Sequence, residues 1–201
     1  MPRTQDQYEV IRKKRKIQIM ESALQLFASE GYGHVSISSL AAHAGISKGL
    51  MYNYFKSKED LLQQVIDFVI SEVLEHIDPN NDGVLTQEEF KLFIRKTFEL
   101  MREKAELYTQ FFSLVLQPNV SDYFMKSPMI THMGGYFEMF HRYFIEQGFE
   151  DPQLEVLQLS ALIEGLGVML VFYSRFSEMP EKLFDKLEER IIHTYTSNEN
   201  K

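Results

Sequence analysis

The fold is decided by residues 36–58, which read SISSLAAHAGISKGLMYNYFKSK. Ser36 is a suitable N-cap for a helix over residues 36–44, in which apolar residues recur on one face. Gly45 ends this helix because glycine enters the left-handed region of backbone space without a steric penalty. Ser47 can cap a second helix over residues 47–55, with Met51 facing inward. Two short helices joined by a tight turn are typical of a helix-turn-helix, whose second helix enters the major groove of DNA.

The flanking segments complete a small helical head. Apolar residues at helical spacing predict a first helix over residues 9–30, which ends at Gly31. Ser57 is placed to cap a fourth helix, which runs to about residue 77 and connects the head with the rest of the chain. Residues 1–58 hold nine Lys or Arg and four Asp or Glu, a net charge of +5, whereas the remainder holds 12 and 25, a net charge of −13. A basic head on an acidic body directs the protein towards phosphate by one end only.

A longer pattern accompanies the two short helices. It consists of GISKG at residues 45–49, Tyr52, YFKSKE at residues 54–59, and Leu61. This pattern resembles the DNA-binding signature of the TetR family of transcriptional regulators over roughly residues 12–62. The resemblance implies an all-α fold, with a helix-turn-helix DNA-binding domain over residues 1–58 and a helical ligand-binding and dimerisation domain over residues 59–201. It also implies a homodimeric repressor that binds double-stranded DNA at a near-palindromic operator until a small apolar or aromatic ligand releases it.

The second short helix and its flanks supply the expected DNA contacts. Ser47, Lys48 and Gly49 lie at its amino end, which points into the groove, and Lys48 can donate to guanine acceptors. The resemblance implies that the hydroxyls of Tyr52 and Tyr54 and the ammonium of Lys58 donate to phosphates, although Tyr54 could instead pack in the core. Leu50 departs from the family, which often has Ser or Thr there, and could contact a thymine methyl group. The complete expected set is Ser36, Ser38, Ser47, Lys48, Gly49, Leu50, Tyr52, Asn53, Tyr54 and Lys58.

The connector after the fourth helix carries a second motif. Residues 78–89, DPNNDGVLTQEE, fit the EF-hand calcium-loop pattern D-x-[DN]-x-[DN]-G-x₅-E. The oxygen ligands of a Ca²⁺ ion would come from Asp78, Asn80, Asp82, the carbonyl of Val84, Thr86 and Glu89. The simpler interpretation is a polar helix–helix connector, because turns favour Asp, Asn and Gly. The sequence leaves open whether such an ion is structural or modulates DNA binding.

The rest of the chain predicts a helical body with an apolar interior. Helices are expected over about 87–102, 106–116, 128–147, 152–176 and 181–196, with Pro118 breaking the pattern and a short turn near residues 121–125. A ligand chamber is predicted among Phe111, Phe112, Met133, Tyr136, Phe137 and Phe140, for which plain core packing is the alternative. Apolar stripes for a dimer are expected from Leu159, Leu162, Ile163, Leu166, Met169, Leu183, Leu187 and Ile191.

The sequence contains no motif for several classes of function. The chain has no cysteine, its six histidines show no metal-ligand spacing, and it contains neither a phosphate loop nor a nucleophile motif, so we expect no enzyme. The longest uncharged apolar run, residues 165–173, is shorter than the about 20 residues that span a bilayer, and a cytoplasmic protein is expected. The alternative function is a calcium-binding interaction protein that uses the helical body for partner binding, with DNA binding secondary.

Overall fold

The computed structural model describes residues 5–125, 128–176 and 181–197, and within these ranges the chain forms ten α-helices and no strand. The all-α fold class predicted from the sequence is confirmed. The helices are α1 (Gln5–Glu30), α2 (Ile37–His43), α3 (Lys48–Tyr52), α4 (Lys58–Leu74), α5 (Gln87–Glu103), α6 (Ala105–Val115), α7 (Pro118–Met125), α8 (Pro128–Glu146), α9 (Pro152–Phe176) and α10 (Glu181–Thr196).

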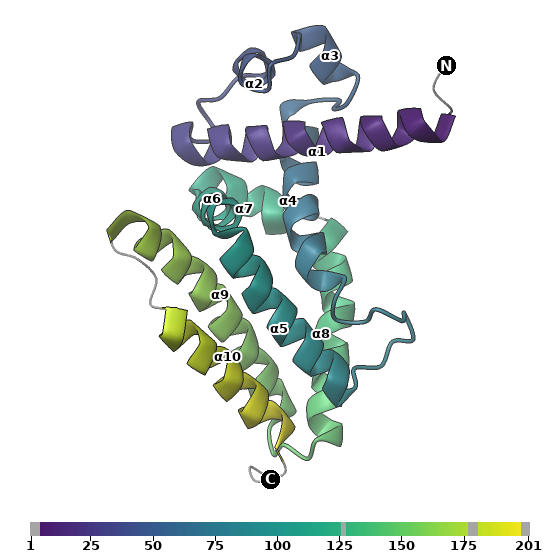
Figure 1. The fold of residues 1–201 in the computed structure, drawn as a ribbon, viewed down its shortest axis with the longest axis vertical. Coiled ribbons are helices and arrows are strands. Elements are labelled where there is room, and N and C mark those ends of the chain that lie inside the picture. Colours follow the sequence, from purple (N-terminus) through teal and green to yellow (C-terminus); the bar gives the residue numbers. More distant parts are fainter. Residues whose placement is uncertain (1–4, 126–127, 177–180, 198–201) are drawn as a thin grey trace.

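Helices α1 to α3 form a head that lies across one end of a longer body (Figure 1). The side chain of Ser36 accepts a hydrogen bond from the backbone N–H of Ser39, and that of Ser47 accepts one from Leu50, so both predicted N-caps are present. Gly45 has φ +64°, the left-handed conformation that ends α2. The local sequence therefore places α3 at the end of the molecule farthest from the body.

Helix α4 begins in the head and runs down into the body, where α5, α8, α9 and α10 lie lengthwise (Figure 1). The core of the lower body is aromatic. The rings of Phe90 and Tyr143 stack with their centroids 5.0 Å apart, and the hydroxyl of Tyr143 donates to the carbonyl of Tyr195 at 2.9 Å. These contacts join α5, α8 and α10 into one packed unit beneath α6.

Two predicted elements differ from the structure. The fourth helix ends at Leu74, three residues earlier than predicted. The helical pattern is interrupted before Pro118, as predicted, since α6 ends at Val115. Pro118 then begins the short helix α7, where the sequence predicted only a turn. Proline is suited to the first position of a helix, because the N–H that it lacks would have no intrahelical partner there.

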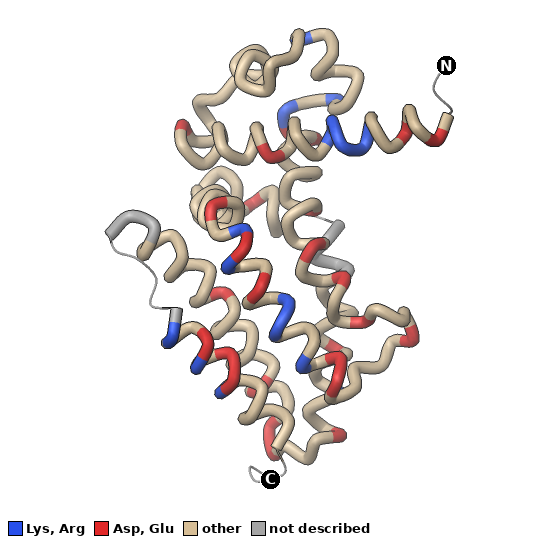
Figure 2. The backbone as a smooth tube through the Cα atoms, in the orientation of Figure 1, with Lys and Arg blue, Asp and Glu red and all other residues tan. Residues whose placement is uncertain are grey.

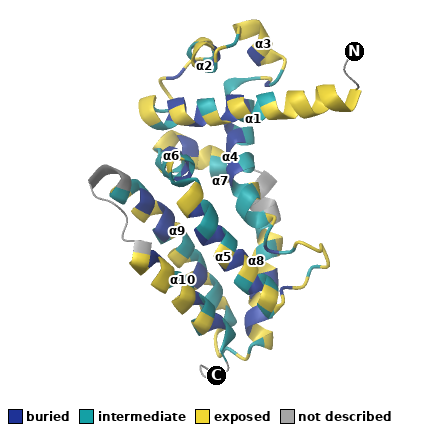
Figure 3. Cartoon of the chain, in the orientation of Figure 1, coloured by how far each residue is buried: buried dark blue, intermediate teal, exposed yellow. Residues whose placement is uncertain are grey.

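Helix α9 presents a large apolar face outside the core (Figure 3). An 18-residue stretch within Pro152–Tyr173 has a mean hydropathy of 1.8 and only 22% of it is buried, so α9 is long and apolar enough to cross a membrane by length and composition. The prediction from uninterrupted apolar runs missed this feature, because Glu155 and Glu164 divide the segment. A second copy of the chain could equally cover this face.

Candidate nucleic-acid interface and ligand pocket

The polar residues of helix α3 are exposed to solvent, and a few buried apolar residues pack the helix onto the head. Met51 is completely buried and Phe55 nearly so, which anchors α3 on α1 and α2. Tyr52 is 50% exposed and Leu50 37% exposed, on the outer side of the head. The remaining predicted contact residues that are exposed are Ser36, Ser38, Ser47, Lys48, Gly49 and Asn53. A ligand as large as duplex DNA could therefore reach this set without any rearrangement.

Tyr54 is half-buried, between the two roles that the sequence left open. The guanidinium of Arg12 lies 4.9 Å from the centre of its ring and donates to the carbonyl of Asn53 at 2.9 Å. Lys16 lies 5.8 Å from the ring of Phe55 in the same way. The basic cluster of α1 thus packs its charges onto the segment that follows α3, which concentrates positive charge beside the recognition helix.

Lys58 has a structural partner that the sequence did not indicate. Its ammonium donates to the carbonyls of Tyr32 and Val35, both at 3.0 Å, and lies 4.3 Å from the ring centre of Tyr32. These bonds fasten the connector between α1 and α2 to the start of α4. An ammonium has three N–H donors, so one is left for the predicted phosphate contact.

The charge distribution follows the predicted division between head and body. Figure 2 shows Lys and Arg gathered on α1 and near the start of α4, whereas Asp and Glu are spread along the body. The basic patch and the exposed face of α3 belong to the same end of the molecule (Figures 1 and 2). The electrostatic field of the chain therefore favours the binding of a polyanion at the head.

Gln117, at the end of α6, joins the body to the head. Its amide nitrogen donates to the carbonyl of Phe27 at 3.0 Å, and its amide oxygen accepts from the N–H of Tyr32 at 2.9 Å. The rings of Tyr32 and Tyr123 also meet, with centroids 5.7 Å apart. Sequence reasoning missed Gln117, because a single glutamine after a helix carries no periodic signal.

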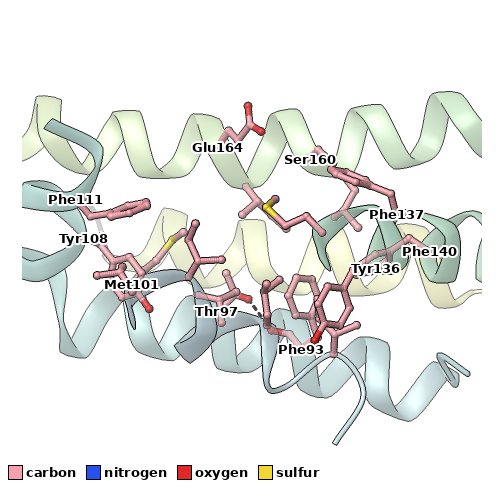
Figure 4. A pocket seen from close by; sticks show the side chains of 18 of the residues that line it. Phe93, Thr97, Met101, Tyr108, Phe111, Tyr136, Phe137, Phe140, Ser160 and Glu164 are labelled. Carbon is pink, nitrogen blue, oxygen red and sulfur yellow. Dashed lines mark hydrogen bonds between the residues drawn. The ribbon is translucent and has the colours of Figure 1, made fainter. Parts of the chain in front are cut away.

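The body contains a partly open apolar pocket of about 210 Å³ between α4, α5, α6, α7, α8 and α9 (Figure 4). All six residues predicted for a ligand chamber line it, namely Phe111, Phe112, Met133, Tyr136, Phe137 and Phe140. Phe111 and Phe140 are also buried in the core, and Phe112 and Tyr136 pack against it, so the lining is compatible with core packing as well. Whether these residues bind a ligand stays a prediction.

Gly167 explains how α6 and α9 approach so closely beside this pocket. A Cβ atom added to Gly167 would lie 1.9 Å from the ring of Phe112, so the glycine provides the space for that ring. Gly165 meets nothing within 4 Å. The close neighbour of Gly167 is therefore a side chain of the same molecule.

The structure does not support the predicted calcium ion. Asp78 and Asp82 accept hydrogen bonds from backbone N–H groups within the loop, such as Gly83 N–H to Asp78 at 3.0 Å. Glu89 is turned to the start of α5, where one carboxylate oxygen accepts from the N–H and the hydroxyl of Thr86 at 2.9 and 2.7 Å. Within the described ranges, no three Asp, Glu, His or Cys side chains come together as metal ligands. This oxygen of Glu89 therefore serves the cap of α5.

The residues predicted to form the dimer stripes include a buried group and an exposed group. Leu159, Leu166 and Ile191 are buried inside the molecule's own body. Leu162, Met169 and Leu183 are at least 40% exposed. Periodicity did not indicate the outer face of α9, which consists of Leu154, Leu157, Val168 and Phe172, all at least 45% exposed.

These features define a class of protein, a helix-turn-helix DNA-binding head on a helical body with an apolar pocket. Residues 19–65 match the model of "Bacterial regulatory proteins, tetR family". Residues 19–65 of the head are thus similar to the DNA-binding domain of this family.

Similar sequences are regulators. The chain is 29% identical over 91 residues to the "Fatty acid metabolism regulator protein" of Bacillus subtilis, covering 45% of this chain and 47% of that one. It is 36% identical over 69 residues to the HTH-type transcriptional regulator LuxR of Vibrio harveyi, covering 34% of each chain. The chain thus matches less than half the length of these relatives.

Similar folds extend over almost the whole chain. The transcriptional regulator FadR of Bacillus subtilis, solved in complex with stearoyl-CoA, has a TM-score of 0.65 at 22% identity and covers 90% of this chain and 98% of its own. A TetR-like regulator from Rhodococcus sp. RHA1 has a TM-score of 0.65 at 18% identity, covering 90% and 94%. At these identities the likeness concerns the fold.

Proposed function

We propose that the protein is a dimeric transcriptional repressor that binds a near-palindromic DNA operator through α3 and is released by a small apolar ligand in the body. Residues 1–58 form the DNA-binding domain in this proposal, and residues 59–201 the ligand-binding and dimerisation domain. The observation that carries it is the exposure of Lys48, Gly49 and Tyr52 on α3 beside the basic cluster of α1. A protein with this activity works in the cytoplasm, where the chromosome of a bacterium lies.

The dimer is supported by the outer face of α9. Leu154, Leu157, Val168 and Phe172 follow one another at helical spacing and are at least 45% exposed. Such an apolar strip is costly in water and is typical of a surface that another protein covers. A second copy, with its own α9 and α10, supplies a matching strip and brings a second head to the DNA.

The ligand is supported by the pocket. Its lining is mostly aromatic and aliphatic, which suits the body of an apolar molecule. FadR of Bacillus subtilis holds stearoyl-CoA, an apolar chain with a polar head, on the same fold. We infer that this chain also accepts an elongated apolar body.

A connection from the ligand to the DNA-binding head is supported by α6. This helix lines the pocket with Tyr108, Phe111 and Phe112, and just beyond its end Gln117 bonds to the last turn of α1. A ligand that shifts α6 would move a group that holds the head. The two heads of the dimer would then no longer match the spacing of the operator.

The experiment is a comparison of Tyr52→Phe with Tyr173→Phe. Fluorescence anisotropy with a duplex selected from genomic fragments measures the affinity of each purified variant. Removal of the Tyr52 hydroxyl removes a hydrogen bond to a charged phosphate, and we expect affinity to fall roughly tenfold or more. Tyr173 lies on α9 in the body, and its substitution should leave affinity unchanged. Equal affinities for Tyr52→Phe and the parent protein would refute the assigned role.

Calcium binding by residues 78–89 stays a separate, untested prediction. Its support is the sequence motif, in which Asp78, Asn80 and Asp82 stand at the first, third and fifth positions of the loop. Isothermal titration with Ca²⁺ tests it directly, with Glu89→Gln as the variant that should lose binding. If Ca²⁺ titration gave the same heat of binding for the parent protein and for Glu89→Gln, the loop would be a polar connector and no calcium site.

A further inference from the structure

Glu164 of α9 is the one acidic or basic side chain among the described residues that line the body pocket. It is exposed to solvent, so it lies where the pocket is open. Within the described ranges, neither a hydrogen bond nor an ion pair joins its carboxylate to another residue. A carboxylate without such a partner is available to a ligand, and Glu164 can therefore recognise a charge on one.

Two hydroxyl groups that line the pocket do not have this freedom. Ser160, one turn before Glu164 on α9, donates to the carbonyl of Val156 at 2.8 Å. Thr97 of α5 donates to the carbonyl of Phe93, also at 2.8 Å. Each hydroxyl thus already has an acceptor in its own helix. The carboxylate of Glu164 therefore dominates the electrostatic preference of the pocket.

The aromatic part of the wall suits a positive charge as well. Eight of the residues that line the pocket are aromatic. The face of an aromatic ring is negative and attracts a cation that lies within about 6 Å of the ring centre. Phe137 of α8 is 43% exposed, and Figure 4 shows it near the segment of α9 that carries Ser160 and Glu164. An aromatic ring and a carboxylate thus both belong to the exposed part of the same pocket.

The charge of the pocket decides between the possible ligands. A carboxylate or phosphate would be repelled by Glu164, and no Lys, Arg or His among the described lining residues would offset this repulsion. We propose that the ligand is an apolar cation, such as an alkylammonium ion, with its apolar body among the aromatic rings and its charge beside Glu164. This inference rests on the proposed function, because it uses the same pocket. It separates this chain from FadR of Bacillus subtilis, which was solved in complex with stearoyl-CoA.

The experiment compares three probes that share one apolar chain, namely decyltrimethylammonium, 1-decanol and decanoate. Isothermal titration of the whole chain gives the affinity of each, at low ionic strength because salt screens an exposed carboxylate. An ion pair near a protein surface is worth up to about fivefold in affinity, and the two charged probes differ in the sign of this contribution. We therefore expect decyltrimethylammonium to bind at least about tenfold more tightly than decanoate, with 1-decanol between them.

Glu164→Gln keeps the shape of the side chain and removes its charge. The affinity for decyltrimethylammonium should fall about fivefold, that for decanoate should rise, and that for 1-decanol should change less than about twofold. Opposite changes for two probes of one chain length do not arise from a general loss of folding. Glu138→Gln is the matched control, because Glu138 is exposed on α8 and is not among the described residues that line the pocket. It removes the same net charge and should leave all three affinities unchanged.

The inference would be overturned if decanoate bound as tightly as decyltrimethylammonium or more tightly, or if Glu164→Gln left the affinity for the cation unchanged. In both cases, binding of 1-decanol would show that the apolar pocket of the proposed function still accepts a ligand. If none of the three probes bound, this inference and the ligand part of the proposed function would fail together. Operator binding measured on the same samples shows whether the DNA-binding part survives.

Discussion

Replacing Gln117 by alanine tests the junction between the body and the head. The change removes the acceptor of the Tyr32 N–H and one of the donors to the Phe27 carbonyl. That carbonyl keeps the N–H of Gly31 at 3.1 Å, so the larger loss is at Tyr32, which is only 5% exposed. A buried N–H without a partner costs about 1–3 kcal/mol, and we expect a loss of this size in the free energy of unfolding.

Hydrogen exchange of the Tyr32 amide, followed by NMR, locates the effect. Protection at Tyr32 should fall roughly tenfold or more, and denaturant unfolding of the same sample should give the global value. Gln110→Ala is the matched control, because Gln110 on α6 donates to Glu106 within its own helix, at 3.0 Å. It should change stability by less than about 0.5 kcal/mol. Equal protection at Tyr32 in the parent protein and Gln117→Ala would refute the proposed junction.

Three further predictions follow from the contacts described. Gly167→Ala should destabilise by about 1–3 kcal/mol in thermal unfolding, because its methyl group meets the ring of Phe112, whereas Gly165→Ala should be neutral or stabilising; equal effects would contradict the close packing of α6 on α9. Lys58→Met should destabilise the protein by about 1–3 kcal/mol, because it removes two hydrogen bonds at 3.0 Å. If this variant bound DNA more weakly but kept its stability, Lys58 would act as a phosphate contact and not as a structural bond. Leu157→Glu should convert the proposed dimer into a monomer in light scattering, since it places a charge on the outer face of α9. A dimer mass that stays the same in this variant would show that the interface lies elsewhere.

Much of the fold could be predicted because its signals are local. Caps such as Ser36 and Ser47 and the left-handed Gly45 depend on residues within one turn, so the bounds of α2 and α3 were correct to within a few residues. The aromatic lining of the pocket was also visible, since large apolar residues crowd α6 and α8.

The remaining features depend on contacts between distant residues. Apolar periodicity shows that Leu159 and Leu162 need cover, but not that the first is covered by its own body and the second is exposed. Lys58 and Gln117 acquire their partners only when the head closes on α4 and α6. The calcium motif describes which oxygens are present, whereas the structure decides that Glu89 caps α5.

The salt dependence of operator binding tests the central claim most directly. Anisotropy titrations of a selected duplex between 50 and 200 mM KCl report how many phosphates the head neutralises, because each released counterion contributes to the slope. We predict two protein chains per duplex and an affinity that falls roughly a thousandfold or more over this range. Weak binding that does not change with salt, or no duplex enriched from a whole genome, would contradict a DNA-reading head.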